Sequence, residues 1–196
     1  MIGWFKRLKV KRLQKQLRVF SAARLNHTSS TEALQKEIGL YFTLAKLYES
    51  LLGKKKYPFA REQALACYRA AGALDDAPAQ FIVGQKLLEE AMMREELQSS
   101  GLFASDANAT YLKMLYHDAH GFLLAAEKHQ HIKAKRVRGL CHINGWGVPV
   151  DKNVGFDLVV ASIEQENSWD RVQKIFAELG INQSSFFSEL FQHRKK

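Results

Sequence analysis

Four histidines are the residues of this sequence whose spacing could bind a metal ion. His117 and His120 lie three residues apart, and His129 and His131 are separated by one residue. Histidines at i and i+3 share one face of a helix, and neutral imidazole is a common zinc ligand. No cysteine lies nearby and no HExxH pattern occurs. We therefore predict solvent-exposed or helix-capping histidines, with no metal and no other cofactor.

Nucleophilic catalysis would require a serine or cysteine beside a base, and a third group that orients this base. The sequence contains no GxSxG, P-loop, GxGxxG or paired-carboxylate pattern. Its two cysteines, Cys67 and Cys141, lie in apolar helical stretches without CxxC spacing. This context indicates buried thiols and no disulfide framework. The prediction is a protein without enzymatic activity.

Positive charge is concentrated at the N-terminus of the chain. The formal net charge is +9, and residues 1–27 contribute +8 because they contain eight lysines and arginines and no acid. The apolar residues of this segment recur at helical spacing: Val10, Leu13, Leu17 and Phe20. This pattern predicts a basic amphipathic helix through about residue 25.

Three roles are open for this basic helix. It could pack on the rest of the protein as a structural cap, or dock on an anionic membrane or an acidic protein through residues 1–25. It could also contact phosphates of a nucleic acid, although nucleic acid is not the expected partner. The predicted contacts with a membrane or acidic partner are Trp4, Phe5, Lys6, Arg7, Lys11, Arg12, Lys15 and Arg18.

Composition and targeting signals favour a soluble, globular chain. The sequence is 46% hydrophobic and 25% charged, which is typical of a globular domain. It has no apolar run of about 18 residues, the length that a transmembrane helix requires. Lys6 and Arg7 interrupt the apolar start before a signal-peptide core could form. We expect a cytoplasmic protein, or one held peripherally at the inner face of a membrane.

Hydrophobic periodicity predicts helices along the whole chain and no convincing strand. The sequence Ser29-Ser30-Thr31-Glu32 has the form of a capping box, with Ser29 as the N-cap of a second helix that runs to Gly53. Turn signals divide the remainder. The further helices are expected at about residues 59–72, 77–98, 107–129, 131–143, 152–165, 169–179 and 184–194.

The chain contains three copies of one pattern of small and large residues. The second copy follows the first at an offset of 55 residues and the third follows 36 later, so the first interval holds about 19 extra residues. Such self-similarity indicates stacked helical hairpins, whose small residues let neighbouring helices approach closely. The copies begin at Ala64, Ala119 and Gly155 and continue through Tyr68, Leu123 and Val159 to Ala71, Ala126 and Ser162.

The most distinctive turn joins the second copy to the third. Gly145 and Gly147 permit positive φ, Pro149 fixes φ, and Asp151 can cap the next helix. With Val148, these are the predicted structural turn residues. This Gly-x-Gly-Val turn followed by an Asp resembles the Sel1-like repeat, a short α/α repeat related to the tetratricopeptide repeat. The resemblance covers roughly residues 40–180.

The resemblance implies an all-α fold, a right-handed α-solenoid of stacked helical hairpins. We expect a basic N-terminal helix over residues 1–28, a repeat domain over 29–182 with an insertion near 91–109, and a C-terminal capping helix over 183–196. The aromatic residues of that last helix could otherwise form a docking patch. They are Phe186, Phe187, Leu190 and Phe191.

Proteins of this family are typically adaptors and scaffolds, several of them in bacterial signalling, secretion and host interaction. The resemblance therefore implies a non-catalytic adaptor that binds a protein or peptide partner through the inner face of the solenoid. The alternative is a peripheral membrane component of a bacterial secretion or envelope complex, anchored by its basic N-terminal helix. Repeat register places the partner-binding residues at Tyr48, Gln80, Lys135, Arg138 and His142.

Overall fold

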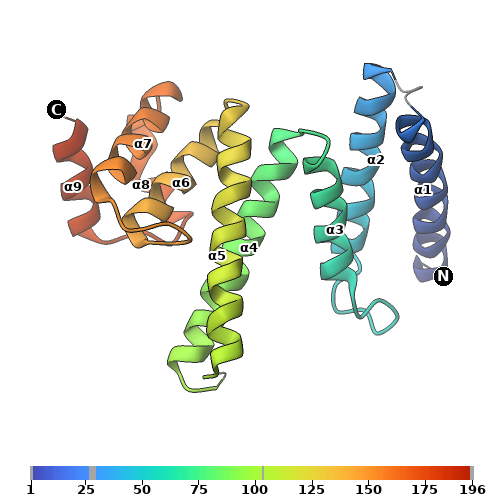
Figure 1. Cartoon of the computed structure of the whole chain (residues 1–196), viewed down its shortest axis with the longest axis horizontal. Helices are drawn as coiled ribbons and strands as arrows, with labels where there is room; N and C mark the ends of the chain where they lie inside the picture. Colours follow the sequence, from blue (N-terminus) through green and yellow to red (C-terminus); the bar gives the residue numbers. More distant parts are fainter. Residues whose placement is uncertain (1, 27–29, 103, 195–196) are drawn as a thin grey trace. The chain divides into compact units, whose positions relative to one another are not determined.

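The computed structural model describes residues 2–26, 30–102 and 104–194, and over these residues it is helical, with no strand (Figure 1). The prediction of an all-α fold of stacked hairpins is confirmed. In chain order the elements are α1 (Ile2–Leu25), α2 (Thr31–Glu49), α3 (Ala60–Gly72), α4 (Ala77–Ser99), α5 (Asp106–Lys128), α6 (Ile132–Asn144), α7 (Lys152–Gln165), the 3-10 turn η1 (Trp169–Arg171), α8 (Val172–Ala177) and α9 (Ser184–Arg194). None of the described helices combines the length and apolar character needed to cross a bilayer.

Three predicted boundaries need correction. The N-cap of α2 is Ser30, whose side chain accepts a hydrogen bond from the Ala33 amide, and the predicted cap Ser29 lies outside the described residues. Helix α2 ends at Glu49, four residues before the predicted end at Gly53. Residues 50–53 form a turn in which Gly53 has φ of +69°. The single helix expected over 169–179 is a 3-10 turn followed by the short α8.

The chain forms two compact units, and the boundary between Val83 and Gly84 falls inside α4. Unit 1 holds α1, α2, α3 and the first residues of α4. Unit 2 holds the rest of α4 and all later elements. The right-handed course of a whole solenoid and the predicted division at residues 28 and 182 stay predictions.

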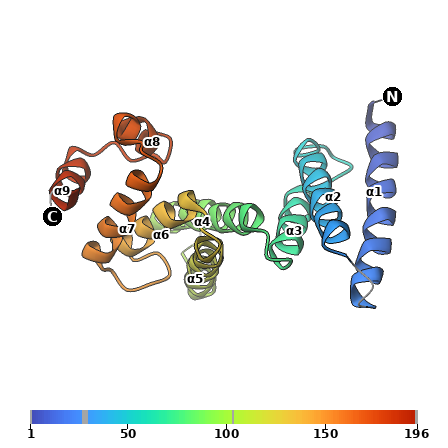
Figure 2. The ribbon, with the colours of Figure 1, turned by 90° about the horizontal axis from the view of Figure 1, so that it is seen from above.

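Helix α1 packs along α2 in unit 1, and α2 packs in turn on α3 (Figure 2). Val10, Leu13 and Leu17 of α1 are buried, as their helical spacing predicts. Polar contacts accompany them: the Gln14 amide donates to the Tyr48 hydroxyl at 3.0 Å, and Arg24 Nε donates to the fully buried carboxylate of Glu37 at 3.1 Å. Helix α1 is therefore an integral layer of unit 1.

The three copies of the repeat bury residues at equivalent positions. Each copy places its first small residue, its large residue and its last small residue in the interior. The last small residue is the second of the alanine pair, so Ala71 and Ala126 lie inside whereas Ala70 and Ala125 are partly exposed. The buried positions of the three copies are Ala64, Tyr68 and Ala71, then Ala119, Leu123 and Ala126, then Gly155, Val159 and Ser162.

The same kind of helix crossing occurs two times in unit 2, once between α4 and α5 and once between α6 and α7. A Cβ atom on Gly84 of α4 would lie 2.8 Å from Leu123 Cγ of α5, and a Cβ atom on Gly139 of α6 would lie 2.8 Å from Val159 Cγ2 of α7. Both distances are too short for carbon atoms in contact, so each crossing requires a glycine. These glycines occupy the same place in successive copies. The crossing is thus the structural unit that the sequence pattern repeats.

The extra residues of the second copy lengthen the α4–α5 hairpin. Measured from the crossing, α4 and α5 are each ten residues longer than α6 and α7, and the connecting loop is one residue shorter, which accounts for the 19 additional residues. The two arms lie side by side (Figure 1). The Tyr116 hydroxyl donates to Glu95 at 2.6 Å, and the Asn108 amide donates to Gln98 at 2.8 Å. The insertion is therefore ordered helix.

Aromatic rings join α9 to the end of unit 2. Phe186 lies 4.8 Å from Phe176 of α8 and 5.5 Å from Phe156 of α7, between ring centroids. Leu190 is fully buried in the same cluster, whereas Phe191 is partly exposed. Helix α9 thus covers the apolar ends of α7 and α8.

Candidate functional site

The turn between α6 and α7 contains all five predicted turn residues. Gly145 ends α6 in the left-handed conformation, and the Asp151 carboxylate accepts a hydrogen bond from the Val154 amide as the N-cap of α7. Gly147 has φ of +76°, and a Cβ atom there would lie 2.2 Å from the Tyr116 carbonyl oxygen of α5. The turn thus fixes α6 against α5 through direct backbone contact.

Tyr48 and Gln80 do not form part of an accessible surface. Tyr48 lies under Gln14 of α1, and Gln80 donates a hydrogen bond from its amide to the Gly72 carbonyl at 3.0 Å. Both side chains are buried in unit 1. The repeat register placed both residues in the correct helices. It could not show that α1 covers Tyr48 and that the end of α3 covers Gln80, so the prediction that these two side chains bind a partner is wrong.

Lys135, Arg138 and His142 share one face of α6, at i, i+3 and i+7. Arg138 forms an ion pair with Glu127 of α5, in which Nη2 lies 3.1 Å from Oε1 and Nε binds the other oxygen. Arg138 Nη1 lies 3.4 Å from His142 Nε2, and Lys135 Nζ donates to Gln165 of α7 at 3.0 Å. These three predicted residues are brought together.

His120 of α5 completes this group, although repeat register did not assign it. Its ring packs edge-to-face on His142 with centroids 5.5 Å apart. His120 Nε2 is buried and has no hydrogen-bond partner among the described residues. The sequence marked His120 only as one of two histidines on a helix face. We define the α5–α6 polar face as His120, Glu127, Lys135, Arg138 and His142.

The imidazoles of this face are neutral near pH 7. Burial, together with the adjacent Arg138 cation, lowers the pKa of His120 to about 4. Burial and Arg138 also lower the pKa of His142. Burial raises the pKa of the neighbouring Cys141 thiol to about 12, so this thiol is not activated as a nucleophile. The face can therefore donate and accept hydrogen bonds, but its residues include no activated nucleophile.

The depressed pKa of His120 predicts a loss of stability in acid. The unfolded chain takes up a proton on this histidine below pH 6.5, whereas the folded chain does so only near pH 4. The free energy of unfolding should fall as pH is lowered through this window, by about 1–2 kcal/mol because the ring is half-buried and partly screened. Urea titrations across the window should show this loss, and His120→Phe should reduce it.

The exposed His117 provides a control for this experiment. His117→Ala should leave the acid-dependent loss of stability as it is in the unchanged protein. If His120→Phe and His117→Ala had identical pH profiles, the assignment of the titration to His120 would be wrong.

His129 and His131, the second predicted pair of histidines, have a local role or face solvent. His131 is the N-cap of α6, where Nδ1 accepts a hydrogen bond from the Ala134 amide at 3.2 Å, and His129 is exposed. Capping and exposure are the two roles that the sequence predicted for all four histidines, and the prediction is wrong for His120, which is partly buried with an enclosed Nε2. Among the described residues, no group of three or more histidines, cysteines or carboxylates has the arrangement to hold a metal ion.

Most cations of α1 are exposed, whereas Arg24 is paired with Glu37 of α2. Lys11, Arg12, Lys15 and Arg18 are exposed, as are Arg7 and Lys9. Lys6 is partly covered and donates to the Ser50 hydroxyl at 3.1 Å. Phe5 is 63% exposed, and the side chain of Trp4 lies outside the described part of the chain.

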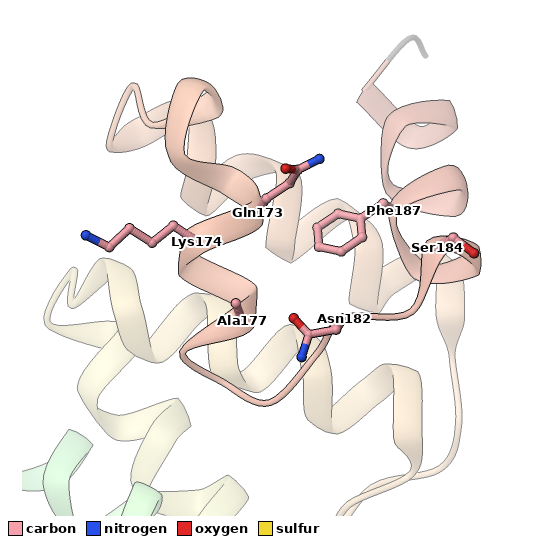
Figure 3. A pocket seen from close by; sticks show the side chains of 6 residues that line it. All are labelled: Gln173, Lys174, Ala177, Asn182, Ser184 and Phe187. Carbon is pink, nitrogen blue, oxygen red and sulfur yellow. The ribbon is translucent and has the colours of Figure 1, made fainter.

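A shallow pocket of about 550 Å³ lies between α8 and the start of α9 (Figure 3). The sequence did not indicate it. Its side chains are two amides, a hydroxyl, an ammonium group, a methyl group and an aromatic ring, with no acid, cysteine or histidine among them. They belong to Gln173, Asn182, Ser184, Lys174, Ala177 and Phe187.

Successive hairpins that cross at equivalent small residues define a helical-repeat protein. No protein-family profile and no curated protein matches the sequence. The solved structures that resemble it include a Sel1 repeat protein from Oxalobacter formigenes, which is 20% identical, with 81% of this chain and 70% of that chain covered and a TM-score of 0.26.

A second is c5321, a protective antigen of uropathogenic Escherichia coli with an SLR fold, which is 17% identical with a TM-score of 0.29. The match covers 93% of this chain and 44% of c5321, so the chain spans less than half the length of that protein. Both are Sel1 repeat proteins, the family that the turn at Gly145 and Gly147 resembles.

Proposed function

We propose that this protein is a non-catalytic scaffold that binds a partner protein through the α5–α6 polar face. The observation that carries the proposal is a cluster of partly exposed polar side chains on one face of α6, in which Arg138 is paired with Glu127 and lies beside His142. Helical repeats characteristically present such surfaces to other macromolecules.

The geometry of the face suits recognition of a peptide segment. Glu127 fixes the guanidinium plane of Arg138, so little further side-chain entropy is lost when a partner binds. Two of the five N–H groups of Arg138 remain beyond those directed at Glu127 and His142. Neutral imidazoles and these N–H groups can bind peptide carbonyls and amides without the cost of burying an additional charge.

Site-directed photocrosslinking tests this surface in the full chain. A photoreactive residue at His142 should form a covalent adduct with one partner protein in the cells from which the chain comes. The same residue at Lys133, which is exposed on the other side of α6, should not. Equal adducts from both positions, or none from either, would contradict the proposal.

The purified partner then allows affinity to be measured. His142→Ala leaves the Arg138–Glu127 ion pair in place, and we expect it to weaken binding about tenfold, the effect of losing one important interface side chain. Lys133→Ala is the matched control and should bind as the unchanged protein does. Equal affinity of the two variants would exclude His142 from the interface.

A further inference from the structure

We propose that the outward face of α1 docks on an anionic lipid surface while its inward face stays packed on α2. The structural and docking roles that the sequence left as alternatives for this helix then belong to opposite sides of it. The proposal concerns unit 1 and does not depend on the partner-binding face of unit 2.

The contacts that hold α1 on α2 come from its inward face and do not involve the exposed cations of the outward face. Its apolar contacts come from Val10, Leu13 and Leu17, and its buried ion pair joins Arg24 to Glu37. Docking through the opposite side would break none of these interactions. Helix α1 is therefore already folded when it meets a lipid surface. The entropy cost of forming the helix is not part of the cost of docking.

The outward face combines exposed apolar side chains with cations. Leu8 is 45% exposed and Val19 is 64% exposed, at i and i+11, so both lie on one side of the helix. Arg12 and Lys15 occupy intermediate turns of the same side, with Lys11 beside them. Within the described part of the chain, none of these three cations forms an ion pair, and no acid occurs in residues 1–27.

This combination fits a lipid surface better than a nucleic acid. Anionic headgroups attract the cations, and each lysine or arginine near such a surface strengthens partition about fivefold. Aliphatic side chains among the cations can insert between acyl chains at the headgroup boundary. A duplex offers phosphates to the cations, but its backbone offers no apolar layer to Leu8 and Val19.

Vesicle co-sedimentation of the full chain tests the proposal. Vesicles of phosphatidylcholine and phosphatidylglycerol in equal amounts should sediment the protein, whereas vesicles of phosphatidylcholine alone should not. Added salt should weaken binding because it screens the headgroup charge. Equal binding to both vesicles, or to neither, would overturn the proposal.

A matched pair of variants separates the α1 face from net charge. Lys11→Glu, Arg12→Glu and Lys15→Glu together should reduce binding to anionic vesicles by about a hundredfold or more, since three favourable charges are lost. The control reverses three exposed lysines of unit 2 and changes net charge equally: Lys113→Glu, Lys133→Glu and Lys174→Glu. Circular dichroism melts should show both variants folded, and equal loss of binding in the two would overturn the assignment to α1.

The apolar component distinguishes lipid from other polyanions. Leu8→Ser with Val19→Ser removes exposed side chains, so it should weaken vesicle binding about tenfold without affecting the packed face. The binding of duplex DNA, measured at the same salt concentration, should not change in this variant. If the unchanged protein bound DNA more tightly than anionic vesicles, or if the serine variant bound vesicles as before, the lipid assignment would be wrong.

Discussion

Replacing Gly147 with alanine is expected to lower the free energy of unfolding by about 3 kcal/mol, the sum of left-handed backbone strain and overpacking. Gly147 has φ of +76°, and an added Cβ atom would lie 2.2 Å from the Tyr116 carbonyl oxygen. The clash is with backbone of α5, which cannot move aside as a flexible side chain could. Equilibrium unfolding in urea, followed by circular dichroism, measures the loss.

Gly180 is a matched control in the same unit. Its φ is also +76°, but an added Cβ atom would meet nothing within 4 Å. Gly180→Ala should therefore cost about 1 kcal/mol, the backbone strain alone. A loss for Gly147→Ala no greater than that for Gly180→Ala would show that α5 and the turn are not in direct contact.

The second large effect is expected from Arg24→Met. This substitution leaves the carboxylate of Glu37 buried, with the Ser21 hydroxyl donating to it at 2.7 Å and the guanidinium absent. Removal of one partner from a buried ion pair costs about 3–5 kcal/mol, and we expect about 3 because Arg24 itself is 37% exposed. Hydrogen exchange of the α1 amides should report the loosened helix together with the lost stability.

Two further variants test whether the lost charge pairing is the cause. Adding Glu37→Gln to Arg24→Met removes the uncompensated charge and should restore part of the stability. Arg18→Met removes an exposed cation of the same helix and should change stability by no more than about 0.5 kcal/mol. If Arg18→Met and Arg24→Met were equally destabilising, the pairing of Arg24 with Glu37 would not be what holds α1.

Local signals were sufficient to predict the helices and the repeat. Apolar periodicity and turn glycines act within a few residues, so most predicted boundaries agree with the structure to within one or two residues. The crossing also follows from sequence, because small residues such as Gly139 are required wherever two backbones approach closely. These features depend on residues near one another in the chain or on the repeat itself.

The candidate site was less predictable because it depends on which elements cover which faces. Repeat register placed Tyr48 correctly in its helix, but only the docking of α1 buries it. His120 was visible as a histidine, yet its contact with His142 arises from the packing of α5 on α6. Contacts between helices that are distant in the chain decide which side chains are covered, and the residue pattern of a single sequence does not specify these contacts.

The elongated α4–α5 hairpin shows where this architecture can change size. Both arms are extended by ten residues beyond the crossing, so the crossing at Gly84 keeps the geometry of the shorter hairpin. Removing matched numbers of residues from each arm would shorten the projection by about 1.5 Å per residue and leave the crossing intact. Chain length can therefore vary at this tip without moving the crossing, although the arms bury side chains of their own, such as Ala91, Leu112 and Leu115.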